Sequence, residues 1–154
     1  MGQITRIRGR GVVSGATEGP ALIGEAIQSN GALDYRTGEI IQAGHSLRGR
    51  LLAGSVFIVA GAQGSTAWSV RLHTTLLNGV GPVAMVFPRM DARTAGAAAA
   101  MKIPVVTDLE EDVFALVDVG DWVKVDGDRG VVEVCKQEPE GTFRGGHSQE
   151  KGRP

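Results

Sequence analysis

The chain has 154 residues, of which 42% are hydrophobic and 5% aromatic, and its formal net charge is -1. This length fits a single domain that is large enough to bury a substantial core. A nucleic-acid or anionic-membrane surface needs an excess of basic residues, and single-strand binding needs aromatic platforms. We therefore expect neither nucleic acid nor membrane among the partners of this chain.

The cysteine content and the N-terminal sequence bear on the cellular compartment. The one cysteine, Cys135, cannot form a disulfide within the chain and suits a reducing compartment. We interpret it as a small apolar residue near the end of a strand. The first residues, MGQITRIRGRG, contain no apolar segment of the secretory type, and no apolar run approaches the roughly 20 residues that span a bilayer. We therefore expect a cytoplasmic protein.

The first third of the chain indicates β-structure interrupted by glycine-containing turns. We expect strands over 11–15 and 21–27 with a turn at 16–20 between them, and a further turn at 34–38, where the sequence is DYRTG. His45 lies in a glycine-flanked loop without a second ligand at metal spacing. We expect this histidine to be solvated.

The stretch from 55 to 79 is the centre of the predicted fold. Residues 56–60 form an unbroken apolar run, which predicts a strand buried on both faces. Gly61 and Gly64 then allow a tight turn. A helix is expected to follow and to end at 78–79, where the sequence is Asn-Gly. The apolar stripe expected on this helix comprises Ala67, Val70, Leu72, Thr74, Leu76 and Leu77.

The turn before this helix is the most suggestive local feature. Ser65 or Thr66 is expected at the N-cap, beside unpaired backbone N–H groups and the positive end of the helix dipole. Such a turn is a natural anion site, and a plain N-cap is the alternative. It is neither a P-loop, because no lysine precedes Ser65, nor a nucleophile elbow. His73 would lie roughly 12 Å further along the helix axis, which is too far to act as a base for Ser65.

The second half of the chain alternates strands and helices. We expect a strand at 82–87, a helix of small residues at 93–101 and a strand at 103–106, which is the alternation of a parallel α/β layer. Asp91 and Arg93 follow the carboxyl end of a strand, the edge where open α/β sheets bind ligands. An exposed N-cap with a neighbouring arginine is the simpler interpretation of this pair.

The end of the chain returns to β-structure before its composition changes. A β-hairpin is predicted over 121–134, and the residues that follow are polar, glycine-rich and without periodicity. We therefore predict a mixed α/β fold in which a β-rich layer wraps a small parallel α/β core. The ordered domain would span 1–135, and a disordered tail would span 136–154.

Six short segments, taken in order, resemble one protein family. They are GVVSGATEGPAL, DYRTG, HSLRG, GAQGSTAWS, GPVAMV and KIPVV, and the resemblance extends over residues 9–134. The series is similar to the small, or swivel, subunit of the aconitase X group of two-subunit dehydratases. This resemblance implies a swivelling β/β/α domain, which agrees with the mixed pattern above.

The resemblance also implies a larger partner subunit that carries an iron or iron–sulfur centre, while this chain holds no metal or cofactor. Together the two chains would act as a hydro-lyase on a small-molecule hydroxy acid, and this chain alone would be inactive. Ser65 occupies the position of the family's proton-accepting serine. The implied substrate-binding residues around it are Gln63, Gly64, Thr66 and Ser69.

Gln63 departs from the family pattern, in which an arginine precedes the last glycine of the turn. A neutral side chain there favours cis-3-hydroxy-L-proline or a related hydroxy acid over mevalonate 5-phosphate, the phosphorylated substrate of archaeal members. Two alternatives remain open. One is the small subunit of a mevalonate 5-phosphate dehydratase, and the other is a non-catalytic homo-oligomeric anion-binding module of the same fold.

The chemistry of a serine base also points to a shared site. A serine hydroxyl is a poor base at neutral pH, and the dipole of the following helix contributes about 0.3–2 kcal/mol, which is too little to make Ser65 an alkoxide. The sequence places no lysine beside Ser65 and shows no cluster of metal ligands. We therefore expect a partner to supply the missing cationic groups.

Overall fold

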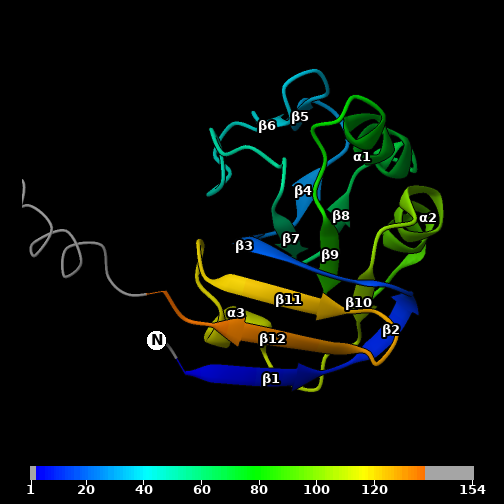
Figure 1. Ribbon diagram of the computed structural model, residues 1–154. Helices are drawn as coiled ribbons and strands as arrows, with labels where there is room; N and C mark the ends of the chain where they lie inside the picture. Colours follow the sequence, from blue (N-terminus) through cyan, green and yellow to red (C-terminus); the bar gives the residue numbers. More distant parts are fainter. Residues whose placement is uncertain (1–2, 138–154) are drawn as a thin grey trace, which may run out of the picture.

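The computed structural model of the chain describes residues 3–137, in which the main feature is an eight-stranded sheet of order β1-β12-β11-β3-β7-β9-β10-β2 (Figure 1). Its strands are β1 (Ile4–Arg8), β2 (Arg10–Val13), β3 (Ala16–Gly24), β7 (Val56–Val59), β9 (Ala84–Phe87), β10 (Val105–Thr107), β11 (Trp122–Asp126) and β12 (Val131–Cys135). Two small pairs add β4 (Ile27–Gln28) with β8 (Ala62–Gln63), and β5 (Leu33–Asp34) with β6 (Glu39–Ile40). The helices are α1 (Trp68–Leu77), α2 (Ala92–Met101) and α3 (Val113–Leu116).

Strand β3 joins two halves of the sheet. Its residues 16–20 pair antiparallel with β11, and its residues 21–24 pair parallel with β7. The turn predicted at 16–20 is therefore wrong. Gly19 serves close packing and not a reversal of the chain, because a Cβ at this position would lie 2.4 Å from the carbonyl oxygen of Gly54. Beyond β3, the parallel strands β7, β9 and β10 form the α/β half that was predicted from the alternation of strands and helices.

The sheet curls until its two outermost strands meet. β1 and β2 stand at opposite ends of the strand order, yet only Gly9 separates them in the chain. The tip of the β11–β12 hairpin lies against β2, where a Cβ on Gly11 would be 1.9 Å from the carbonyl oxygen of Gly127. Glycines at this crossing permit a backbone approach that no side chain would allow.

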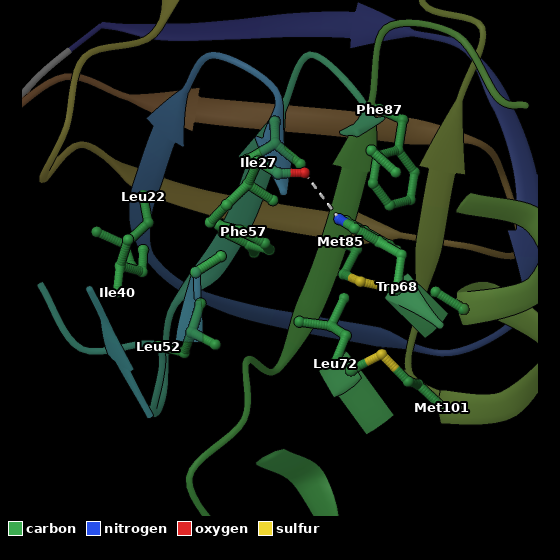
Figure 2. Packing of buried hydrophobic residues seen from close by; sticks show 14 of the residues in the cluster. Leu22, Ile27, Ile40, Leu52, Phe57, Trp68, Leu72, Met85, Phe87 and Met101 are labelled. Carbon is green, nitrogen blue, oxygen red and sulfur yellow. Dashed lines mark hydrogen bonds between the residues drawn. The ribbon is translucent and has the colours of Figure 1, made fainter. Parts of the chain in front are cut away.

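Strand β7 is buried on both faces, as its unbroken apolar run predicted. Phe57 and Val59 belong to a core under α1 and α2, whereas Val56 and Ile58 belong to a second core inside the curled sheet. Figure 2 shows the first core, which gathers large side chains from strands, helices and loops: Leu22, Ile27, Ile40, Leu52, Trp68, Leu72, Met85, Phe87 and Met101. The second core is rich in valine from β11 and β12: Val123, Val125, Val132 and Val134.

Helix α1 begins later than predicted. Ala67 is its N-cap residue and provides no capping side chain, so neither Ser65 nor Thr66 holds that position. The Ser65 hydroxyl instead accepts a hydrogen bond from the Ala67 N–H at 3.2 Å. This bond holds Ser65 in a turn that precedes the helix, because the serine oxygen satisfies an N–H before the first helical residue.

The apolar stripe predicted for α1 is only partly correct, since Leu72 is buried and Leu76 packs against the first core, but other members face outward. Val70 and Leu77 are 64% and 72% exposed. The buried face is set by Trp68, which donates from its indole Nε1 to the carbonyl oxygen of Ile27 at 3.0 Å (Figure 2). The indole also makes an edge contact with Phe87 at 6.3 Å between ring centroids. The size of the indole and its need for a buried acceptor outweigh the spacing of the smaller apolar residues.

The helix and the hairpin predicted in the second half of the chain are both present. The helix expected at 93–101 is α2, and the hairpin expected over 121–134 is β11 and β12, with Cys135 as the last residue of β12. Among residues 3–137, none of the helices has the length and apolar character needed to cross a bilayer. The predicted tail, 136–154, lies outside the described residues apart from its first two.

Candidate functional site

The candidate site is built on the turn between β8 and α1. Strand β8 pairs with β4, which brings the loop after β4 beside Gly64 and Ser65. Gly64 has a φ of +90°, in the left-handed region that favours glycine, and a Cβ there would lie 2.8 Å from the hydroxyl oxygen of Ser29. The turn therefore requires glycine for two reasons, its backbone conformation and its close approach to Ser29.

Ser65 presents its hydroxyl at the surface of this turn. The residue is exposed, and its Oγ accepts from the Ala67 N–H at 3.2 Å. Ser29, which is only 5% exposed, lies beneath it: Ser29 Oγ accepts from the Ser65 N–H at 3.3 Å and lies 3.4 Å from Ser65 Oγ. Two hydrogen-bonding groups therefore converge on the oxygen of an accessible serine.

The other site residues implied by the resemblance lie near this serine in different positions. Thr66 follows it and is exposed, and Ser69, one turn into α1, donates to the Thr66 carbonyl at 3.4 Å. Ser69 also lies where α1 packs on α2, because a Cβ on Gly96 would be 3.5 Å from its hydroxyl. Gln63 is exposed at the end of β8. The predicted residues thus share one turn and the first turn of the helix.

Arg93 brings a positive charge to the same turn. Its Nη1 donates to the carbonyl oxygen of Gly64 at 2.8 Å, and its Nη2 lies 3.4 Å from Oδ2 of Asp91. Asp91 is the N-cap of α2, in a capping box with Thr94, and the Thr94 backbone N–H holds the pKa of this carboxyl below its usual range. This geometry agrees with the predicted placement of Asp91 and Arg93 at the carboxyl edge of the sheet. The contact between Arg93 and Gly64 could not be predicted from their positions in the sequence.

A second set of contacts holds the DYRTG turn against α1. Arg71 donates to the hydroxyl of Tyr35, and its guanidinium lies 5.9 Å from the centre of that ring. Asn78, at the C-cap of α1, donates from Nδ2 to the Tyr35 carbonyl at 2.9 Å. The family-like motif at 34–38 therefore packs on the helix that carries the candidate site.

His45 is buried and not solvated as predicted. It is 5% exposed, its Nε2 lies 3.0 Å from the Glu25 carbonyl oxygen, and its Nδ1 accepts from the Leu47 N–H at 3.0 Å. A ring nitrogen that accepts a backbone hydrogen carries no proton, so this arrangement assigns the neutral tautomer with the proton on Nε2. Beside it, the hydroxyl of Ser46 lowers the pKa of Glu25 to about 2. His45 thus supports the loop and lies outside the turn that holds Ser65.

The turn around Ser65 is an open surface. Three hollows lie elsewhere on the chain. One of about 310 Å³ is lined by residues of β1, β11 and β12, one of about 330 Å³ lies beside the start of β7, and one of about 220 Å³ surrounds Trp122. Within residues 3–137, no group of three or more His, Cys, Asp or Glu side chains is placed to hold a metal ion. A small substrate at Ser65 would need a second surface to enclose it.

Comparison with known proteins identifies the family. The family model of the aconitase X swivel domain matches residues 6–134. The chain belongs to this family. In the solved aconitase X of Thermococcus kodakaraensis (holo-form), the matching chain has a TM-score of 0.78 and 27% identity, and the match covers 86% of this chain and 99% of that one. A UPF0107 protein solved by NMR in solution matches with a TM-score of 0.74 and 31% identity, over 86% of this chain and 100% of that one.

The names of related proteins agree with this family assignment. The phosphomevalonate dehydratase small subunit of Methanocella arvoryzae is 36% identical over 84% of this chain and 98% of its own length. That of Methanosarcina mazei is 32% identical over 86% of this chain and 92% of its own length. The predicted fold and the predicted small subunit of an aconitase X-type dehydratase are thereby confirmed. Both relatives are named for phosphomevalonate, and neither name mentions cis-3-hydroxy-L-proline.

Proposed function

We propose that this aconitase X swivel subunit completes a phosphomevalonate dehydratase, and that Ser65 removes the carbon-bound proton of the substrate. The observation that carries the proposal is the position of the Ser65 hydroxyl: it is exposed on a glycine turn and accepts the Ala67 N–H at 3.2 Å. The arginine contact at the preceding carbonyl adds positive charge beside it. Such surroundings favour an anionic oxygen over a neutral hydroxyl.

The proposed reaction removes water from a hydroxy acid. A proton leaves the carbon beside the carboxylate, the hydroxyl group leaves the next carbon, and a double bond forms between them. The anionic Ser65 Oγ takes the proton, and the electron pair of the broken C–H bond enters the double bond. The hydroxyl group leaves as hydroxide with the electron pair of the C–O bond and becomes water by taking up a proton. The role of this chain is to orient the serine oxygen and to lower the pKa of its hydroxyl, because a general base must lie within hydrogen-bond reach of the proton it takes.

The open turn supports a site shared with a larger subunit. The relatives are named small subunits, which implies a larger partner for each of them. Ser65 lies on an exposed surface and the described residues of this chain bring no metal-ligand group together, so the side chains that hold the family's iron or iron–sulfur centre would come from the partner. In the complex, the partner would cover the turn and keep water from the substrate.

The position of Arg93 supports a phosphorylated substrate. Gln63 is neutral where the family has arginine, and this alone favoured an amino-acid substrate. Arg93, however, reaches the same turn from α2 and donates to the Gly64 carbonyl at 2.8 Å. A guanidinium presents several donors in a fixed fork that suits phosphate and carboxylate oxygens. The guanidinium that is absent at position 63 is thus present at the neighbouring Gly64, on a side chain of α2 that also pairs with Asp91.

The test is to purify the chain together with its partner from native lysate and to assay dehydration of phosphomevalonate and of cis-3-hydroxy-L-proline. We expect a larger iron-containing chain, turnover of phosphomevalonate, and loss of at least about a thousandfold in kcat for Ser65→Ala with the complex intact. Recovery of the chain alone or only with itself would contradict the shared site. Turnover by Ser65→Ala near the wild-type rate would contradict the role of the serine.

A further inference from the structure

Ser29 is a buried serine whose hydroxyl has no part in the function argued so far. It follows β4 and is 5% exposed. Its Oγ accepts from the Ser65 N–H at 3.3 Å and lies 3.4 Å from Ser65 Oγ. Within residues 3–137, both hydrogen-bond contacts of this hydroxyl go to Ser65. The two serines therefore form a closed pair, one buried and one accessible.

The charge state of Ser65 decides the direction of the hydrogen bond between the two hydroxyls. A serine hydroxyl has one proton to donate and two lone pairs to accept. One lone pair of Ser29 Oγ accepts the Ser65 N–H, which leaves its proton and its second lone pair available, so either hydroxyl can donate while both serines are neutral. An anionic Ser65 oxygen can only accept. In that state Ser29 must therefore be the donor.

We propose that Ser29 is a positioning residue that donates a hydrogen bond to Ser65 Oγ and stabilises the anionic form of this oxygen. The proposal rests on the role of Ser65 as the base. The anionic oxygen would receive two donors, the Ala67 N–H and the Ser29 O–H, as in an oxyanion site. Ser29 keeps its proton throughout, and the proton of the substrate goes to Ser65 Oγ.

The backbone around the pair is shaped for this contact. A Cβ on Gly64 would lie 2.8 Å from Ser29 Oγ, so only glycine lets the turn approach the buried hydroxyl. Burial of Ser29 also keeps water away from its side of the pair, and a hydrogen bond to a charged oxygen is stronger where water is excluded.

Among residues 3–137, the charged side chain that hydrogen-bonds to this turn is Arg93 of α2, and it pairs with Asp91, the N-cap of that helix. The Thr94 backbone N–H lowers the pKa of Asp91, so this carboxylate stays ionised near neutral pH. A shift of the pH profile between two variants that act on the same substrate would therefore report on Ser65.

The experiment compares Ser29→Ala and Ser29→Thr in the complex with the larger subunit, with phosphomevalonate as the substrate. We expect Ser29→Ala to lower kcat by about 10- to 100-fold, the range for a hydrogen bond to a charged group. The acid limb of the pH profile of kcat should move to higher pH by about one unit or more, because the anionic oxygen has lost a donor. Ser29→Thr keeps the hydroxyl and should recover most of the rate and the wild-type limb.

Ser55→Ala is the matched control. Ser55 is 3% exposed, its Oγ donates to the Leu52 carbonyl at 2.7 Å, and it precedes β7 at the end of the strand opposite the turn. This variant should lose stability and leave the acid limb in place. If Ser29→Ala behaves like Ser55→Ala, Ser29 is structural and the proposal is overturned, while inactivity of Ser65→Ala would still support the base. If Ser65→Ala stays active, the proposed function fails as well.

Discussion

Gly64 is the residue on which the geometry of the candidate site depends most directly. It has a φ of +90°, its carbonyl accepts from Arg93, and it leaves room for Ser29. The glycine and the serine that follows it could be predicted from the sequence, because a strand, a glycine turn and a helix are local features. The contacts with Ser29 and Arg93 could not, since they span 36 and 29 residues of chain and carry no local pattern.

Arg93 is expected to contribute to substrate binding through its charge. Arg93→Gln keeps an N–H donor for the Gly64 carbonyl but removes the positive charge, so the turn should persist. We expect KM for phosphomevalonate to rise about 10-fold or more, with a smaller change in kcat, because a charge-assisted contact with phosphate is lost. The check is steady-state kinetics of the purified complex, with Arg89→Gln, an exposed arginine after β9, as the control. Equal effects of the two substitutions would show that Arg93 has no special part in substrate binding.

The secondary-structure elements differ in how far local sequence determines them. β7, β9 and α2 could be predicted because an apolar run or a capping residue marks each of them. The orientation of α1 could not, since it follows from one buried indole and its acceptor on β4. The first part of β3 was predicted as a turn because Gly19 and Pro20 are typical turn residues. Gly19 instead allows close packing against Gly54, which is distant in the sequence.

Trp68 is expected to anchor helix α1 through its indole N–H. Trp68→Phe retains an aromatic ring but removes the indole N–H, so the Ile27 carbonyl would lose its donor in a buried position. We expect the free energy of unfolding to fall by about 1–3 kcal/mol. Denaturant unfolding of the chain measures this change. Val70→Ala on the exposed face of the same helix should stay within about 0.5 kcal/mol of wild type, and a similar loss for both variants would contradict the anchoring role of the indole.

At the scale of the molecule, one chain holds two cores and an open site. The curl of the sheet could not be predicted, because it depends on glycines of β2 and of the β11–β12 hairpin meeting across the molecule. The larger subunit was inferred from the resemblance and from what the chain lacks for the chemistry of a serine base.

The residues that follow β12 bind to Asp121. Lys136 Nζ lies 2.6 Å from Asp121 Oδ2, and the Gln137 N–H donates to Asp121 Oδ1 at 3.1 Å.

Asp121 therefore couples the stability of the whole fold to pH. Burial raises the pKa of its carboxyl, but the hydrogen bonds from Lys136 and from the Asp118 and Gln137 N–H groups outweigh this effect, so the pKa in the folded chain is lowered. A lowered pKa means that the folded chain binds fewer protons than the unfolded chain at acidic pH. The stabilisation is present above about pH 4, the ordinary pKa of an aspartate, and is lost as the pH falls through the folded-state pKa.

Asp121→Asn tests this coupling, because an amide cannot ionise and pairs poorly with Lys136. We expect the variant to be less stable than wild type by roughly 1–3 kcal/mol at pH 7, and we expect the difference to shrink between pH 4 and pH 3. Asp118→Asn removes the other, largely exposed partner of Lys136 and should lower the free energy of unfolding by less than about 1 kcal/mol over the whole pH range. Denaturant unfolding at a series of pH values measures both variants. If the difference in free energy of unfolding between wild type and Asp121→Asn stays constant down to pH 3, packing around this residue, and not its charge, stabilises the end of β12.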